Sequence, residues 1–257
     1  MGNQQDLSFW EHLDVLRASI IKMLVVTVIC GIAAFCLKET LFDIVLAPKD
    51  ADFITYGILR LDPFEIQLVN IGLTEQFMVH MKTALFFGIL CASPYIIYLL
   101  YKFISPALYE REKYYGVRIV GGGYVMFLIG VAVNYFLIFP LTLRFLGTYQ
   151  VSSDVHTMLS LQSYMDTLFM MSIIFGVVFE IPVISWLLAL FGVLKADWMR
   201  CYRRHAIVVI LTIAAIITPT SDVFTLLMVS LPIWLLYEAS IWIVQVTAPE
   251  TRTAEAD

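Results

Sequence analysis

Charged residues are scarce in this sequence of 257 residues, of which 14% are Asp, Glu, Lys or Arg and 60% are hydrophobic. The mean hydropathy is +0.85. A soluble domain of this length has too little interior to cover so much apolar surface, so the composition predicts a polytopic membrane protein. The net charge of -5 is small. No basic patch interleaved with aromatic residues occurs, so we expect no nucleic-acid partner.

Motifs of metal, redox and catalytic chemistry are also missing. The four cysteines form no CxxC pair and the four histidines are scattered along the chain, so the sequence predicts neither a disulfide framework nor a metal site. HExxH, GxSxG and phosphate-cradling loops do not occur. We therefore expect no catalytic residues, no cofactor and no enzymatic activity. The first residues lack a basic n-region and a small-residue cleavage site, so no removable signal peptide is expected.

Long apolar runs occupy most of the chain, and they show no internal repeat. They cover residues 20–37, 77–100, 117–141, 167–190, 206–217 and a run that starts near 223 and meets Glu238 after about 15 residues. These runs predict an all-α protein with six transmembrane helices. The fifth run spans only about 18 Å at ~1.5 Å per residue, below the ~30 Å hydrocarbon core. We expect short fifth and sixth spans and a thinner bilayer beside them.

The distribution of Lys and Arg predicts the orientation. With the N-terminus inside, eleven of these residues fall on the cytoplasmic side and four on the other, so both termini should be cytoplasmic. We expect a cytoplasmic interfacial helix in residues 1–19, a membrane domain in 20–246 and a disordered polar tail in 247–257. The long outer loop, residues 38–76, should hold a short amphipathic helix ended by Pro48, and its apolar remainder should pack as a cap.

An acid and a proline interrupt the fourth run, in "FGVVFEIPVISW". Glu180 lies near the middle of this span, where an ionised group is expensive. Pro182 frees a backbone carbonyl one turn earlier, near Val178, so the helix is expected to open there. Glu180 is then a satisfied core acid, a docking point for a polar group of a partner helix, or the titrating group of a proton-coupled transporter or channel. The missing repeat and missing paired broken helices disfavour the transporter.

Two segments on the cytoplasmic side carry clustered charge. "KFISPALYEREKYYGVR", residues 102–118, joins the second and third runs, and "SFWEHLDVLRASI", residues 8–20, precedes the first. The first segment is a solvated turn or a binding site. The second has the apolar spacing of a helix on the membrane surface, either as an anchor or as part of a site.

Five motifs, taken in order, resemble the TatC family. They are "EHLDVLR", "LAP" in the outer loop, "FISPALYERE", "FGVVFEIPV" and "ITPTSDVF", and the resemblance extends from about residue 8 to 245. TatC is the receptor subunit of the twin-arginine protein translocase. The resemblance implies a concave, cup-like six-helix bundle in the bacterial cytoplasmic membrane, without catalytic activity. It implies binding of twin-arginine signal peptides on folded cargo, self-association in a receptor complex, and assembly with TatA/TatB-type subunits that use the proton-motive force.

The resemblance also implies site residues. Glu112 matches the family's signal-binding glutamate, Phe103 its neighbouring aromatic, and Glu180 the glutamate of the fourth span. The family pattern HLxELR has its glutamate where this chain has Val15, so Glu11 or Asp14 is expected to replace it.

At the start of the sixth run the sequence departs from the family in a second place. The family usually has a glutamine four residues after the matched aspartate, and here Leu226 stands at that spacing from Asp222. Asp222 is expected to cap the following helix, and a role in partner contact is less supported. We expect structural or partner-contact roles for Pro48, Pro182 and Asp222.

Overall fold

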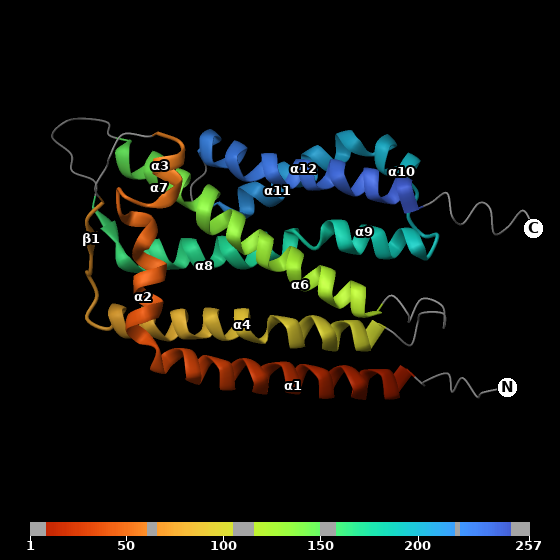
Figure 1. The fold of residues 1–257 in the computed structure, drawn as a ribbon, viewed down its shortest axis with the longest axis horizontal. Helices are drawn as coiled ribbons and strands as arrows, with labels where there is room; N and C mark the ends of the chain where they lie inside the picture. Colours follow the sequence, from red (N-terminus) through yellow and green to blue (C-terminus); the bar gives the residue numbers. More distant parts are fainter. Residues whose placement is uncertain (1–8, 61–65, 105–115, 150–157, 219–221, 248–257) are drawn as a thin grey trace, which may run out of the picture. The chain divides into compact units, whose positions relative to one another are not determined.

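The computed structural model describes residues 9–60, 66–104, 116–149, 158–218 and 222–247, which form helices and one pair of very short strands (Figure 1). The chain divides into two compact units, one made of residues 1–38 and 80–124 and the other of residues 39–79 and 125–257. The all-helical class predicted from the apolar runs is confirmed. Within the described ranges, five helical segments are long and apolar enough to cross a membrane.

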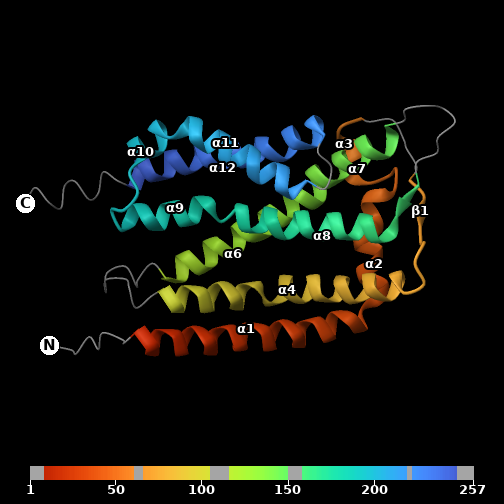
Figure 2. The same cartoon turned by 180° about the vertical axis from the view of Figure 1, so that it is seen from behind.

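The first unit is built on α1 (Phe9–Cys36) and most of α4 (Glu75–Ile104). The two helices lie side by side and antiparallel in both views (Figures 1 and 2). The segment expected as a separate surface helix and the first apolar run form one unbroken helix from Phe9. A methyl group on Gly88 would lie 2.8 Å from the Gly31 nitrogen, so glycine at this position allows the two backbones to approach closely.

The second unit begins with the outer loop. Its elements are α2 (Lys38–Leu46), the 3₁₀ turn η1 (Ala47–Lys49), α3 (Ile54–Ile58) and β1 (Leu68–Val69). The helix predicted before Pro48 is therefore present. Phe53 and Tyr56 are buried as expected for a cap, whereas Ile54 and Ile58 are exposed. Of the other predicted cap residues, Leu61 and Phe64 fall outside the described ranges.

Next in the chain, α6 (Gly116–Val133) continues through the π-helical turn η3 (Asn134–Ile138) into α7 (Phe139–Thr148). Pro140 follows this turn, and its ring removes a backbone donor, which disturbs regular helical bonding. The turn presents Asn134 to the protein interior, where its amide nitrogen donates to the Ser172 hydroxyl at 2.8 Å. A buried polar pair of this kind joins η3 to α8 without exposing polar atoms to lipid.

The remaining elements are β2 (Leu159–Ser160), α8 (Leu161–Val178), α9 (Ile181–Leu190), α10 (Ala196–Cys201), α11 (Arg203–Ile217) and α12 (Val223–Thr247). Strand β1 pairs in parallel with β2, and α12 packs along α9 and α11.

Two of these helices bear on the predicted short spans. The fifth run forms α11, whose 15 residues extend about 22 Å. Its shortness agrees with the expectation, and six crossings remain a prediction. The prediction of a short sixth span is wrong, because α12 continues through Pro232 and Glu238 for 25 residues, about 37 Å. It is not short. A single charge removes no backbone hydrogen bond, so the apolar run ends earlier than the helix does.

Candidate functional site

The residues predicted to receive a signal peptide lie near the ends of helices in the first unit. Glu11 is in the first turn of α1, Asp14 is exposed one turn further on, and Phe103 is in the last turn of α4. Glu112 falls outside the described ranges. Val15, which stands at the family's glutamate position, is exposed, so a carboxylate here would lie on the surface of α1.

The contact between Gly31 and Gly88 sets the register of the two antiparallel helices. Asp14 lies 17 residues before Gly31, and Phe103 lies 15 residues after Gly88. At ~1.5 Å per residue these distances are about 25.5 and 22.5 Å in the same direction, so the two Cα positions differ by only about 3 Å along the helix axes. Glu11 lies one turn nearer the end. The pairing therefore brings Asp14 and Phe103 to the same level.

Tyr101 and Gly116 flank the segment that carries Glu112. A methyl group on Gly116 would overlap the Tyr101 hydroxyl, so the start of α6 and the last turn of α4 are in direct contact. Gly116 is buried. The two ends of the segment between them are thereby held close together, and in the sequence Glu112 lies 11 residues after Tyr101 and 4 residues before Gly116.

Glu180 lies where the fourth span is interrupted. Helix α8 ends at Val178 and α9 starts at Ile181, with Pro182 in its first turn. The Glu180 N–H donates to the Val177 carbonyl at 3.1 Å in a tighter turn. The helix is therefore interrupted at the predicted place, before Pro182. The side chain is half-buried, and its Oε1 is buried with no hydrogen-bond partner among the residues that the structure describes.

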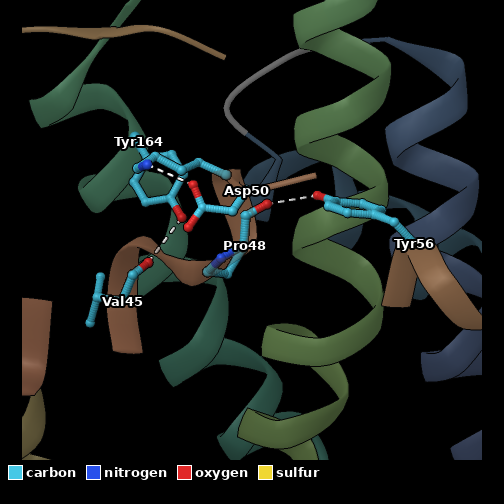
Figure 3. A network of polar contacts seen from close by, with 6 residues as sticks. Val45, Pro48, Asp50, Tyr56 and Tyr164 are labelled. Carbon is cyan, nitrogen blue, oxygen red and sulfur yellow. Dashed lines mark hydrogen bonds and ion pairs between the residues drawn. The ribbon is translucent and has the colours of Figure 1, made fainter. Parts of the chain in front are cut away.

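Pro48 belongs to a buried network under the outer loop (Figure 3). Its carbonyl accepts the Tyr56 hydroxyl at 2.8 Å, and the Pro140 carbonyl also accepts it, at 3.2 Å. The Tyr164 hydroxyl donates to the Val45 carbonyl at 2.9 Å. Burial raises the pKa of Tyr56 well above its ordinary value, so this hydroxyl remains a donor. Tyr56 gives a partner to a carbonyl of η1 and Tyr164 to a carbonyl of the last turn of α2, and these bonds join the loop to α7 and α8.

A carboxylate that sequence reasoning missed, Glu75, is the first residue of α4 and is 6% exposed. Its Oε2 accepts the N–H groups of Ile71 and Gly72, both at 2.9 Å. Its Oε1 accepts the Ser160 hydroxyl at 2.9 Å and the Gln162 N–H at 2.8 Å. An acid at the N-terminus of a long apolar helix, three residues after a glycine, was the available signal.

Two further acids have partners in the structure. Asp222 accepts the Thr225 N–H at 2.7 Å, so the predicted N-cap of α12 is confirmed. Its role in partner contact is untested. Glu238, to which the sequence assigned no role, accepts a hydrogen bond from Arg203 at 2.7 Å. This ion pair ties α11 to α12. Within the described ranges, no group of three or more His, Cys, Asp or Glu side chains is arranged to hold a metal ion.

Residues 11–232 match the family model for the Sec-independent protein translocase protein TatC. The chain is 32% identical over 242 residues to TatC of Desulforapulum autotrophicum, covering 94% of this chain and 86% of the relative. It is also 32% identical over 236 residues to TatC of Aquifex aeolicus, covering 91% and 92%. A crystal structure of the twin-arginine translocase receptor TatC superposes with a TM-score of 0.78 at 31% identity, covering 92% of this chain and 99% of that one.

Long apolar helices with isolated polar groups between them define a multi-pass α-helical membrane protein. The family match and the structural match narrow this class. The chain belongs to the TatC family of Sec-independent protein translocase subunits, a family of translocase components rather than of catalytic enzymes. It is a multi-pass protein of the bacterial cytoplasmic membrane.

Proposed function

We propose that this protein is the receptor subunit of a twin-arginine translocase. It binds the twin-arginine signal peptides of folded proteins and assembles with TatA/TatB-type subunits, which export the cargo with the proton-motive force. The observation that carries the proposal is the common level of Asp14 and Phe103 at one end of the paired helices α1 and α4. The segment with Glu112 begins directly after this end of α4.

In this proposal Glu112 and either Glu11 or Asp14 receive the two arginines. A carboxylate at a partly dehydrated interface matches the planar fork of a guanidinium group, which donates two parallel hydrogen bonds. Each charge-assisted bond contributes roughly 1.5–3 kcal/mol. Phe103 offers an aromatic surface for the apolar residues of the signal peptide. The exposure of Asp14 supports its accessibility to a peptide.

Crosslinking tests whether the protein binds twin-arginine signal peptides at these residues. A photoreactive twin-arginine signal peptide is expected to label positions 11, 14, 103 and 112 in the membrane-embedded protein, and a twin-lysine peptide of the same length should label them much less. Lysine carries the same charge but lacks the bidentate fork, so the comparison isolates the geometry. Equal labelling by both peptides would contradict the proposed role as a receptor for twin-arginine signal peptides. The double variant Glu11→Gln, Asp14→Asn is expected to weaken export of the cargo. Unchanged export would show that neither acid takes the place of the family's glutamate.

For Glu180 we propose a docking role toward the polar position of a partner's transmembrane helix. The interruption between α8 and α9 and the unpartnered Oε1 support it, because a polar atom in hydrocarbon is costly until it gains a hydrogen bond. Glu180→Ala should reduce co-purification of a TatA-type subunit while the signal peptide still crosslinks at Glu112.

Two outcomes would count against this role. Loss of signal binding before loss of assembly would assign Glu180 to another step. Proton flux that needs neither cargo nor partner subunits, and that Glu180→Ala abolishes, would favour the transporter.

A further inference from the structure

Glu75 holds a loop in a defined conformation. The loop, residues 70–74, connects β1 to α4, and the Glu75 carboxylate accepts two of its backbone N–H groups and two donors at the start of α8. With its amide turned so that donors face acceptors, the Asn70 nitrogen also donates to Glu75 Oε2 at 3.0 Å. The parallel pairing of Leu68 with Leu159 lies beside these bonds. The carboxylate therefore joins three segments and turns the polar backbone of the loop inward.

The same arrangement turns apolar side chains outward. Ile71 is 80% exposed and Leu73 is fully exposed, at 101%. Phe77 and Met78, in the first turn of α4, are also exposed, at 59% and 51%. Isolated exposed apolar residues are common in soluble proteins, but these four lie within eight residues of the chain and together expose a large apolar surface. Water is an unfavourable neighbour for such a surface.

Lipid is the occupant that this surface fits. Leu73 lies two residues before Glu75, where the membrane-spanning helix α4 starts, so the exposed loop residues continue the apolar surface of the span beyond its first turn. No Lys, Arg, Asp or Glu occurs from residue 66 to 74. Glu75 is occupied by bonds within the chain and offers no charge to a partner. Apolar side chains without charge, next to a span, suit the boundary between headgroups and acyl chains.

We propose that residues 71–73 form an interfacial anchor. Ile71 and Leu73 insert into the lipid boundary of the leaflet at which α4 and α8 begin, and Glu75 is the positioning residue that holds them there. The charge distribution predicts that this is the outer leaflet. The anchor fixes the depth of the α4 and α8 starts in the bilayer. This inference does not depend on signal-peptide binding.

Fluorescence quenching in lipid vesicles tests the anchor. A bimane probe is attached to Leu73→Cys in full-length protein, reconstituted in phosphatidylcholine and phosphatidylglycerol vesicles. The native cysteines are first replaced by alanine, namely Cys30, Cys36, Cys91 and Cys201. Matched probes are placed at Asp52→Cys, an exposed position of the outer loop, and at Leu24→Cys, exposed on the apolar helix α1. Quenchers are aqueous iodide and lipids with a nitroxide near the top of the acyl chain.

The probe at 73 is expected to respond as the probe at 24 does, strongly to the lipid nitroxide and weakly to iodide, with a depth of about 5–10 Å. A response like that at 52 would overturn the anchor. A disulfide that forms between two copies at position 73 and removes lipid quenching would assign the loop to contact between copies, and would overturn it as well.

Variants of Glu75 test the positioning role. Glu75→Ala removes both acceptor oxygens, so the probe at 73 should shift from lipid quenching toward iodide quenching. Glu75→Gln keeps one acceptor oxygen and nearly the same volume, so it should give an intermediate shift even if the alanine variant fails to fold. Unchanged quenching in both variants would show that the loop is held without Glu75.

Discussion

The contact between Gly31 and Gly88 allows a sharp test of how α1 and α4 are paired. A methyl group on Gly88 would lie 2.8 Å from the Gly31 nitrogen and 2.9 Å from both the Gly31 Cα and the Thr27 carbonyl oxygen. These neighbours are backbone atoms, which cannot rotate away. Ordinary van der Waals contact starts at 3.4 Å, so Gly88→Ala must move the helices apart by roughly 0.6 Å or distort them.

This separation sets the expected loss in the free energy of unfolding. A radial gap of about 0.5–1 Å forfeits a quarter to a half of the dispersion energy of the atoms that face it. Van der Waals packing is also a main force between helices in a membrane. We therefore expect Gly88→Ala to lower the free energy of unfolding by about 1–3 kcal/mol, the usual range for an overpacked position.

Gly31→Ala is the matched control on the other helix of the same contact. Its methyl group would lie 3.6 Å from the Ala84 carbonyl oxygen, an ordinary contact. Both substitutions gain the same helix propensity, about 1 kcal/mol or less, so the difference between the variants isolates the steric effect. Unfolding in mixed micelles titrated with sodium dodecyl sulfate, followed by tryptophan fluorescence, measures the free energies.

A second measurement links this packing to function. Because the pairing sets the level of Asp14 relative to Phe103, Gly88→Ala should also weaken binding of a twin-arginine peptide, and Gly31→Ala should not. The reasoning is refuted if Gly31→Ala is as destabilising as Gly88→Ala, or if both variants are as stable as the parent protein.

Three further predictions concern the second unit. Tyr56→Phe removes the hydroxyl that donates to the Pro48 and Pro140 carbonyls, and should cost about 1–2 kcal/mol in the same titration; the exposed Tyr149→Phe is the control, and equal effects would contradict the network. Glu238→Gln breaks a partly exposed ion pair with Arg203 and should cost no more than about 1 kcal/mol. Exchanging the two charged residues should restore most of that loss, and a loss above about 2 kcal/mol would show a larger role. The bilayer should be thinnest beside α11, whose 15 residues extend about 22 Å. Because α12 is not short, we expect no such thinning beside the sixth span. A cryo-EM map in nanodiscs that shows equal bilayer thickness on all sides would contradict this prediction.

Features that depend on neighbouring residues could be predicted from the sequence. The apolar runs predicted the positions of the long helices. Pro48 predicted the end of α2, and the pair of Glu180 and Pro182 predicted the interruption of the fourth span. The cap formed by Asp222 was predicted for the same reason. Each of these features follows from bonding or sterics within one or two helical turns. The extent of α12 was missed because an apolar run measures hydrophobicity and not backbone hydrogen bonding.

Features that join distant segments could not be predicted. Glu75 reads as an ordinary acid at a helix start, and only the fold brings Ser160 and Gln162 to it. Tyr56 is one of 13 tyrosines, and nothing local indicates that its hydroxyl reaches the Pro140 carbonyl, 84 residues away. The exposure of Ile54 and Ile58 was likewise unexpected, because an apolar side chain gives no sign of which side the fold will cover.

By itself, the sequence determined that this is a helical membrane protein, where its long apolar helices lie, that the fourth span breaks before Pro182, and which motifs it shares with the TatC family. Hydrophobic free energy and backbone sterics act locally, so they can be read from order and spacing. The tertiary structure decided which backbones touch at Gly31 and Gly88, and therefore that Asp14 and Phe103 lie at one level. It also decided that the Glu75 carboxylate accepts hydrogen bonds from Ser160 and Gln162 and that Leu73 is exposed, because these features depend on packing between residues far apart in the chain.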